Sequence, residues 1–221
     1  MSTRYTQLVP GEFYHIYNRG NSKQTIFRDE SDYHHFIKLM YVANSVKPIR
    51  IRDYSKFDVK TVRIKNRLVS IGCYCLMPNH FHILLTPCSE DSASTFMLKL
   101  STSYVMYFNK KYRRTGSLFE GAYKSKYIDS DQYLKYLFSY IHLNPIKLIQ
   151  KDWQEVGIIN KIKAFNYLRE YKHSSFLDYM EPHTLSKNIL SREDFPSYFP
   201  EAILFKKEIF EWISYKDEQS H

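Results

Sequence analysis

The chain has 221 residues, of which 43% are hydrophobic and 25% are charged, and its formal net charge is +9. This composition predicts a globular protein that consists of one domain with an elaboration, or of one domain and a small second one. No apolar run approaches the ~20 residues that cross a bilayer, and three cysteines suggest no disulfide framework, so we expect a cytoplasmic protein without membrane contact.

The first predicted strand is an alternating aromatic run over residues 12–20, which ends in an Asn-Arg-Gly turn. His15 shares a strand face with Phe13 and Tyr17, because residues two apart point to the same side. We interpret His15 as a packed residue, or as one that supports a metal ligand, rather than as a ligand itself.

A helix is predicted next, beginning with the capping residues at 29–32 and ending near Val46, before a proline. The apolar residues that recur at helical spacing in it are Phe36, Leu39, Met40 and Ala43. Residues 49–66 are a short stretch in which apolar and basic residues alternate, and we predict that they form a hairpin or an extended insertion.

Two strands follow, over residues 68–77 and 80–87, joined by a Pro-Asn turn. The first of them is almost continuously apolar, which is typical of a central strand. Its Cys73 and Cys75 could form a zinc site with nearby histidines, but the Cys-x-Cys spacing within a strand is poor for one. We therefore predict that both cysteines lie in the core.

The second of these strands begins with two histidines. His80 and His82 project to the same side of the strand, because side chains alternate along it. Two imidazoles on one face form half of a metal site. The alternative, from this pair alone, is that the histidines only fill polar positions on a sheet.

Three further elements complete the predicted sheet domain. A helix begins at residues 91–92 and passes Phe108 into a basic loop at 109–119, and a strand covers 122–128. A third helix, capped by an Asp-Ser-Asp sequence at 129–131, continues to Pro145. The order strand, helix, strand, strand, helix, strand, helix predicts a ferredoxin-like or RRM-like α+β domain with an antiparallel sheet and helices packed on it.

The sequence signals weaken after Trp153, but a helix is predicted from about 201 to 214 as an appended segment. We predict a main domain over residues 1–180, which contains the insertion at about 49–66. An acidic, partly helical C-terminal extension is predicted over 181–221.

Positive charge is distributed unevenly. Seven basic and two acidic residues lie between Arg50 and Arg67, and seven basic residues and one acidic residue lie between Lys99 and Lys126. A basic body with 20 tyrosines predicts a polyanion partner, because cations meet phosphates and tyrosines stack on unpaired bases. For any single residue the alternative is a core position or a solvated face. The candidate nucleic-acid contacts are Arg19, Lys110, Lys111, Arg113, Arg114, Lys124, Lys126 and Lys147.

The third predicted helix could supply what the two histidines lack. Tyr140 and Asn144 are four residues apart and share one helix face, which Lys147 continues one turn later. If this face packs over the strand of His80 and His82, two imidazoles and a carboxamide oxygen surround one point, with a phenol a turn away. Nitrogen and oxygen ligands suit a divalent cation such as Mg²⁺ or Mn²⁺ holding a phosphate. The cation would help a phenol, whose pKa is ordinarily about 10, to act as a nucleophile.

Two short motifs occur in this order about 60 residues apart: Pro-Asn-His-Phe-His at 78–82 and Tyr-Ile-His-Leu-Asn-Pro-Ile-Lys at 140–147. Together they resemble the signatures of the REP-associated tyrosine transposases, which belong to the HUH superfamily of single-strand transposases. The resemblance extends over most of residues 10–180. The chain departs from the compact pattern of that family in the insertion near 49–66 and in the acidic tail past residue 181.

This resemblance implies a ferredoxin-like fold that recognises a DNA hairpin of the repetitive palindromic type and cuts the adjacent single strand. It implies that Tyr140 is the nucleophile, that His80 and His82 are the metal-binding pair, and that Asn144 is the third ligand. The implied reaction is transesterification through a 5′-phosphotyrosine with Mg²⁺ or Mn²⁺ as cofactor. No nucleotide cofactor is expected, in agreement with the lack of a Gly-rich phosphate loop in the sequence. We expect a monomer or a homodimer.

Two other classes of function stay open at this point. A non-catalytic module that binds hairpin DNA or RNA would use the basic and aromatic surface without cutting. A metal-dependent phosphoesterase would use the histidines to activate water. That class usually needs more acidic ligands, and no Asp or Glu lies at motif spacing beside the histidines.

Overall fold

The structure, a computed structural model, describes residues 7–47, 64, 66–181 and 188–214. Its strands form one antiparallel sheet in the order β2-β3-β1-β4. They are β1 (Tyr14–Arg19), β2 (Val69–Met77), β3 (His80–Pro87) and β4 (Lys124–Tyr127). This order, with β1 and β3 in the centre, is that of a ferredoxin-like fold, so the predicted α+β class is confirmed.

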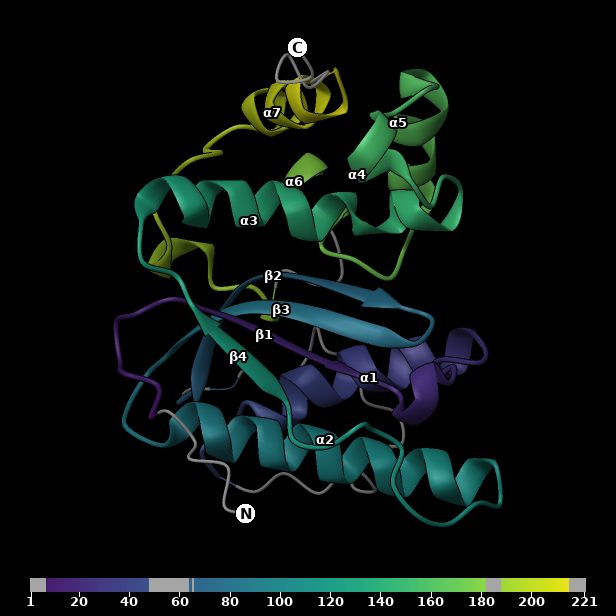
Figure 1. The fold of residues 1–221 in the computed structure, drawn as a ribbon. Helices are drawn as coiled ribbons and strands as arrows, with labels where there is room; N and C mark the ends of the chain where they lie inside the picture. The colour runs from purple at the N-terminus through teal and green to yellow at the C-terminus, as the bar shows by residue number, and fades with distance from the viewer. Residues whose placement is uncertain (1–6, 48–63, 65, 182–187, 215–221) are drawn as a thin grey trace.

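Helices cover both faces of the sheet. The helices α1 (Glu30–Ala43) and α2 (Ser92–Lys111) lie on one face, and α3 (Asp131–Leu143) lies across the other (Figure 1). Phe81 of β3 points toward α1, where its ring centroid lies 5.1 Å from that of Phe36. Since side chains alternate along a strand, the neighbours of Phe81, which are His80 and His82, face α3.

The predicted helix caps are present. Asp29 accepts a hydrogen bond from the backbone nitrogen of Asp32, and Ser130 accepts one from that of Tyr133. α1 ends at Ala43, three residues before the predicted end. The reason is that the side chain of Asn44 bonds to β2, donating to the carbonyl oxygen of Val69 at 2.9 Å and accepting from its nitrogen at 2.8 Å.

Two other predicted boundaries differ from the structure. α2 continues to Lys111, so the first residues of the predicted basic loop form its last turn, where cations are favourable beside the negative end of the helix dipole. β4 spans four residues rather than the predicted 122–128, and all four are exposed. A short edge strand that carries lysines resists pairing with another chain.

The opposite edge of the sheet, along β2, is covered by the chain itself. The backbone nitrogen of Leu76 donates to His173 O at 2.8 Å, and that of Ser175 donates to Tyr74 O at 3.0 Å. Farther along β2, the ring of Phe195 packs against Gly72, and a Cβ at this position would come within 2.8 Å of the ring. These contacts attach residues 173–175 and Phe195 to the sheet.

The C-terminal third adds helices beyond α3 (Figure 1). They are α4 (Trp153–Val156), α5 (Lys161–Glu170), α6 (Phe176–Met180) and α7 (Ala202–Ser214). The structure also has short 3-10 turns, η1 (Asn21–Lys23), η3 (Asn144–Leu148) and η5 (Arg192–Asp194). α7 lies where the appended helix was predicted, whereas α4, α5 and α6 were not predicted. The side chains of Phe205, Ile209 and Ile213 anchor α7 and are at most 1% exposed.

Cys73 and Cys75 are fully buried in β2, which confirms their predicted core positions. The predicted insertion at 49–66 lies almost entirely outside the described residues. In the part of the chain that the structure describes, no helix is long and apolar enough to cross a membrane.

Candidate active site

Three histidines meet on the sheet face that α3 covers. In the antiparallel pairing of β1 with β3, Tyr17 lies opposite His82, which places His15 diagonally across from His82. His15 Nε2 and His82 Nδ1 share a hydrogen bond of 2.8 Å, and His80 Nδ1 lies 2.6 Å from Asn79 Oδ1. The ring centroids of His80 and His82 are 5.0 Å apart. His15 therefore supports His82, one of the two roles that the sequence suggested for it.

These imidazoles are neutral at physiological pH. Burial, together with the positive charge of Lys126 near His15 and of Lys147 and Arg19 near His80, lowers the pKa of each of these two imidazoles to about 4. Burial also lowers the pKa of His82 well below its usual value, helped by the other two histidines. A histidine must be neutral to bind a metal ion. When Nδ1 of each ring carries the proton, His80 donates a hydrogen bond to Asn79 and His82 donates one to His15. Nε2 of each ring then keeps a free lone pair.

Tyr140 on α3 lies over the histidines. Its ring centroid is 6.0 Å from that of His82 and 6.4 Å from that of His15. Burial raises the pKa of the half-buried Tyr140 phenol, and hydrogen bonding with the side chains of Asn144 and Gln154 acts in the opposite direction. The phenol and the imidazoles of one chain therefore form a single cluster.

The end of α3 places two more polar groups in this cluster. The helix stops at Leu143 because Pro145 cannot continue it, and η3 follows in place of the helical turn that the sequence suggested. Lys147 in η3 still reaches back to Tyr140, with Nζ 5.7 Å from the ring centroid. Asn144 is fully buried, and its Nδ2 donates to the carbonyl oxygen of Tyr140 at 2.9 Å.

The second polar atom of Asn144 has no partner. Its Oδ1 is buried and makes no hydrogen bond within the described residues. A buried acceptor that lacks a partner destabilises a fold by about 1–3 kcal/mol, so it calls for an explanation such as an ion. Together with the neutral His80 and His82, this oxygen is a donor set that fits a divalent cation. In the described part of the chain no group of three His, Cys, Asp or Glu residues could hold a metal ion. The third ligand of this donor set must therefore be the side-chain amide of Asn144.

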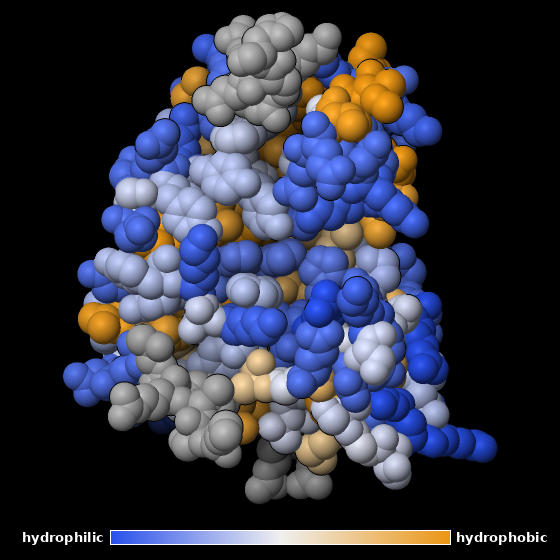
Figure 2. Space-filling view, viewed as in Figure 1, coloured by the Kyte–Doolittle hydropathy of each residue, from blue (hydrophilic) through white to orange (hydrophobic). Residues whose placement is uncertain are grey.

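A basic cleft of about 360 Å³ opens beside His80. Its lining residues are Tyr17, Asn18, Arg19, Asn79, His80, Glu120, Lys124 and Lys147. The cleft holds three cations against one carboxylate, and that carboxylate, Glu120, forms a 2.8 Å ion pair with Arg19. In Figure 2 the surface over the strands is mostly hydrophilic. The balance of charge favours a phosphate-bearing ligand here.

The eight candidate nucleic-acid contacts separate into two groups. Arg19, Lys124 and Lys147 line the cleft, and Lys126 lies beside it on β4. The other four, Lys110, Lys111, Arg113 and Arg114, cluster at the C-terminal end of α2. Among these, Lys111 pairs with Asp29 at 2.8 Å and with the fully buried Asp32 at 2.7 Å, so its charge is compensated within the protein.

Sequence reasoning missed two features of this site. It paired His80 with His82 but did not connect His82 to His15, because the diagonal contact depends on the register between β1 and β3. It also omitted Glu120, the only acidic residue of the cleft lining. Glu120 reaches the cleft because Phe119 forms an antiparallel bridge with Gly20, next to Arg19.

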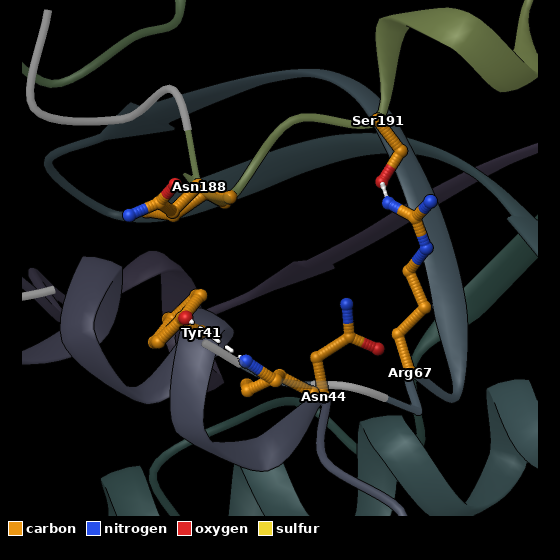
Figure 3. Close-up of a pocket in the computed structure, with 7 residues that line it drawn as sticks. Tyr41, Asn44, Arg67, Asn188 and Ser191 are labelled. Carbon is orange, nitrogen blue, oxygen red and sulfur yellow. Dashed lines mark hydrogen bonds between the residues drawn. The ribbon is translucent and has the colours of Figure 1, made fainter. Parts of the chain in front are cut away.

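A second hollow, of about 220 Å³, has no histidine in its lining (Figure 3). Its only cationic lining residue, Arg67, donates to Ser191 and pairs with Glu193 at 3.0 Å and with Asp194 at 3.3 Å. In Figure 3 Arg67 and Ser191 point toward each other. These contacts hold η5 and the residue before it against the segment that leads into β2, which is a structural role.

Comparison with known proteins finds one family model that matches the chain. The model of the family described as "Transposase IS200 like" matches residues 13–144, a span that includes His80, His82, Tyr140 and Asn144. No curated protein matches the chain. Among solved structures, the chain is similar to a REP-associated tyrosine transposase bound to a REP hairpin, with 13% identity and a TM-score of 0.49, over 89% of this chain and 92% of that one. It is also similar to the tRNA(His) guanylyltransferase from Saccharomyces cerevisiae, with 11% identity and a TM-score of 0.35, over 99% and 85% of the two chains.

Proposed function

The chain belongs to the IS200-like transposase family, and we propose that it cleaves and rejoins single-stranded DNA beside a hairpin, with Tyr140 as nucleophile. The observation that carries the proposal is the position of the Tyr140 ring, 6.0 Å from that of His82, next to a basic cleft. One chain supplies both groups, which supports a site that is assembled within a single subunit.

In this proposal His80, His82 and Asn144 hold a divalent cation such as Mg²⁺ or Mn²⁺. The support is the neutral state of both imidazoles and the partnerless Oδ1 of Asn144. When bound, the cation supplies Lewis-acid stabilisation of negative charge on the phosphate oxygens.

The protein's own groups position and activate the nucleophile. The phenol oxygen of Tyr140 attacks phosphorus, the 3′-hydroxyl of one fragment leaves, and the 5′ phosphate of the other fragment stays on Tyr140. The positive charge of Lys147, 5.7 Å from the ring, stabilises the phenolate that must form. One phosphodiester replaces another, so a second 3′-hydroxyl can reverse the step without a nucleotide cofactor.

Recognition of a hairpin rests on the resemblance of the two sequence motifs to the REP-associated tyrosine transposases. The cleft is consistent with it, because Arg19, Lys124 and Lys147 can bind backbone phosphates. Phosphate contacts position DNA without reading its sequence, so the sequence of the hairpin does not follow from this cleft.

The test is the formation of a covalent adduct. Incubation with a DNA hairpin that carries a single-stranded flank, in Mn²⁺, should yield a protein–DNA adduct that survives denaturation and retains the 5′ phosphate. Tyr140→Phe removes one oxygen and should abolish the adduct while leaving DNA binding intact. Tyr136→Phe is the matched control, because it makes the same change one helical turn earlier, and it should form the adduct normally.

The outcomes separate the classes of function. An adduct that persists in Tyr140→Phe moves the nucleophile to another tyrosine. Cleavage without an adduct points to water as the nucleophile and to a phosphoesterase. Binding without cleavage or adduct, across a panel of hairpins, points to a non-catalytic binding module.

A further inference from the structure

A row of aromatic side chains leads along α3 to Tyr140. The ring centroids of Tyr133 and Tyr136 are 6.0 Å apart, and those of Tyr136 and Tyr140 are 5.8 Å apart, with interplanar angles of 21° and 28°. Trp212 of α7 joins the row, with its ring centroid 5.0 Å from that of Tyr136. We call Tyr133, Tyr136 and Trp212 the aromatic track.

The aromatic track lies at the edge of the hydrophobic core. Its three side chains are partly exposed and line a hollow of about 450 Å³, whereas the core-facing residues of α3, such as Leu134 and Leu137, are at most 2% exposed. Figure 2 shows a band of pale side chains, of intermediate hydropathy, over α3 and toward α7 beside strongly hydrophilic surface. The volume of the hollow is also within the range of small-molecule sites in proteins.

Positive charge accompanies these rings. Lys126 Nζ lies 4.5 Å from the centroid of the Tyr133 ring. Glu208, the one acidic residue of the hollow's lining, is neutralised by Lys135 at 2.8 Å and accepts a hydrogen bond from Trp212 Nε1 at 3.0 Å. Aromatic faces beside lysines are the pattern with which proteins bind single-stranded nucleic acid, since bases stack on the rings and phosphates meet the cations.

We propose that the aromatic track binds the unpaired bases of the DNA strand next to the phosphate that Tyr140 attacks. This inference rests on the proposed function for the identity of the strand. The seven helical steps from Tyr133 to Tyr140 cover roughly 10 Å along the helix axis, which matches about three nucleotides at the 3.4 Å spacing of stacked bases. The track therefore holds the strand in line with the nucleophile, and α7 contributes Trp212 from outside the family span at residues 13–144.

The test measures binding in the Tyr140→Phe background, so that cleavage cannot influence it. Three hairpin probes are compared by fluorescence anisotropy: one blunt, one with three unpaired thymidines, and one with three abasic sugars in their place. Stacking on aromatic side chains contributes an amount per base that corresponds to about 5- to 160-fold in affinity. The thymidine tail should therefore bind at least about 5-fold more tightly than the abasic tail, although both carry the same phosphates.

Substitutions then locate the effect. Tyr136→Leu and Trp212→Leu should each reduce the difference between thymidine and abasic tails, and leave binding of the blunt hairpin unchanged. Tyr136→Phe keeps the ring and should retain the difference. Tyr127→Leu, at an exposed tyrosine of β4 outside the track, is the matched control and should also retain it.

Equal affinity for thymidine and abasic tails, or a difference that survives both leucine substitutions, overturns the aromatic track. This result is distinguishable from failure of the proposed function, which shows as the absence of an adduct with unmodified Tyr140. A tail effect that depends on Tyr136 and Trp212 supports the track even if no adduct forms.

Discussion

His15 Nε2 and His82 Nδ1, on neighbouring strands, share a buried hydrogen bond of 2.8 Å. The bond fixes the orientation of the His82 ring and directs its other nitrogen away from β1. Partners of this kind orient metal-binding histidines, and their loss typically lowers metal affinity or activity by 10–100-fold.

The first prediction follows from this bond. His15→Ala should reduce Mn²⁺-dependent cleavage by about 10- to 100-fold and raise the Mn²⁺ concentration needed for half-maximal rate, because the His82 ring loses its partner. His15→Gln, which keeps a hydrogen-bond acceptor, should recover part of the loss. His34→Ala, at an exposed histidine of α1 on the other side of the sheet, serves as the control. A normal Mn²⁺ titration in His15→Ala would show that the bond has no role in metal binding.

The second prediction concerns stability and pH. In the folded chain the pKa of His15 is about 4, so this histidine stays neutral above that pH. In the unfolded chain a histidine has a pKa near 6.5. Between these values the unfolded chain binds more protons, so the free energy of unfolding should fall as the pH drops from 6.5 toward 4 and stay level above 6.5. Each such histidine contributes a slope of up to about 1.4 kcal/mol per pH unit.

Urea unfolding in chelator at pH 7.5, 6.5 and 5.5 measures this slope. His15→Gln removes one titrating group and should flatten the slope between pH 6.5 and 5.5. His80, whose pKa is also lowered to about 4, should contribute in the same direction. A slope that is identical in His15→Gln would mean that His15 is not held neutral.

The third prediction decides which basic surface binds DNA. For single strands, each phosphate contact adds about 0.7 to the slope of log affinity against log salt concentration. The double variant Lys124→Gln, Lys147→Gln should therefore lower that slope by roughly 1.4. Lys110→Gln, Arg113→Gln makes the same charge change at the end of α2 and should leave the slope near its original value. The reverse result would place the DNA on the end of α2.

The fourth prediction gives Lys111 a structural role. Its side chain is 26% exposed, and its Nζ lies 2.7 Å from the fully buried carboxylate of Asp32, which also accepts a hydrogen bond from Tyr112 at 2.8 Å. Lys111→Met should lower the free energy of unfolding by about 3 kcal/mol, because it leaves a buried charge without its partner. Lys110→Met, at the adjacent position, should change stability by no more than about 0.5 kcal/mol. Equal effects of the two substitutions in urea unfolding would contradict this assignment.

The sequence predicted the sheet and the helices α1, α2 and α3 because their apolar periodicity and caps are local signals. It also associated His82 with Tyr140, because two motifs occurred together. It could not predict which motif residues face the site: His142, between Tyr140 and Asn144, is fully buried and bonds through Nε2 to Ser175 at 2.8 Å. That direction depends on how α3 packs, which is a tertiary property.

The same limit applies to the C-terminal third. α5 has a capping asparagine at position 160 and a short apolar face, but its mean hydropathy is low and it is only ten residues long, so the signal was weak. Trp212 belonged to a segment that the sequence set apart as an extension. Its contact with Tyr136 connects it to the site.

The last prediction tests whether residues 181–221 form a separate extension. Phe205 of α7 is fully buried, and its ring centroid lies 5.0 Å from that of Tyr179 and 5.1 Å from that of His142. Phe205→Ala should lower the free energy of unfolding by about 3–5 kcal/mol, because it leaves a cavity in a core shared with α3 and α6. Leu204→Ala, at a neighbouring residue that is 43% exposed, is the control and should have a small effect. If the extension were an independent unit, Phe205→Ala would leave the main unfolding transition in place and remove only a minor one. A single transition that shifts as a whole, followed by both far-UV circular dichroism and loss of adduct formation, would show that α7 and α3 unfold together.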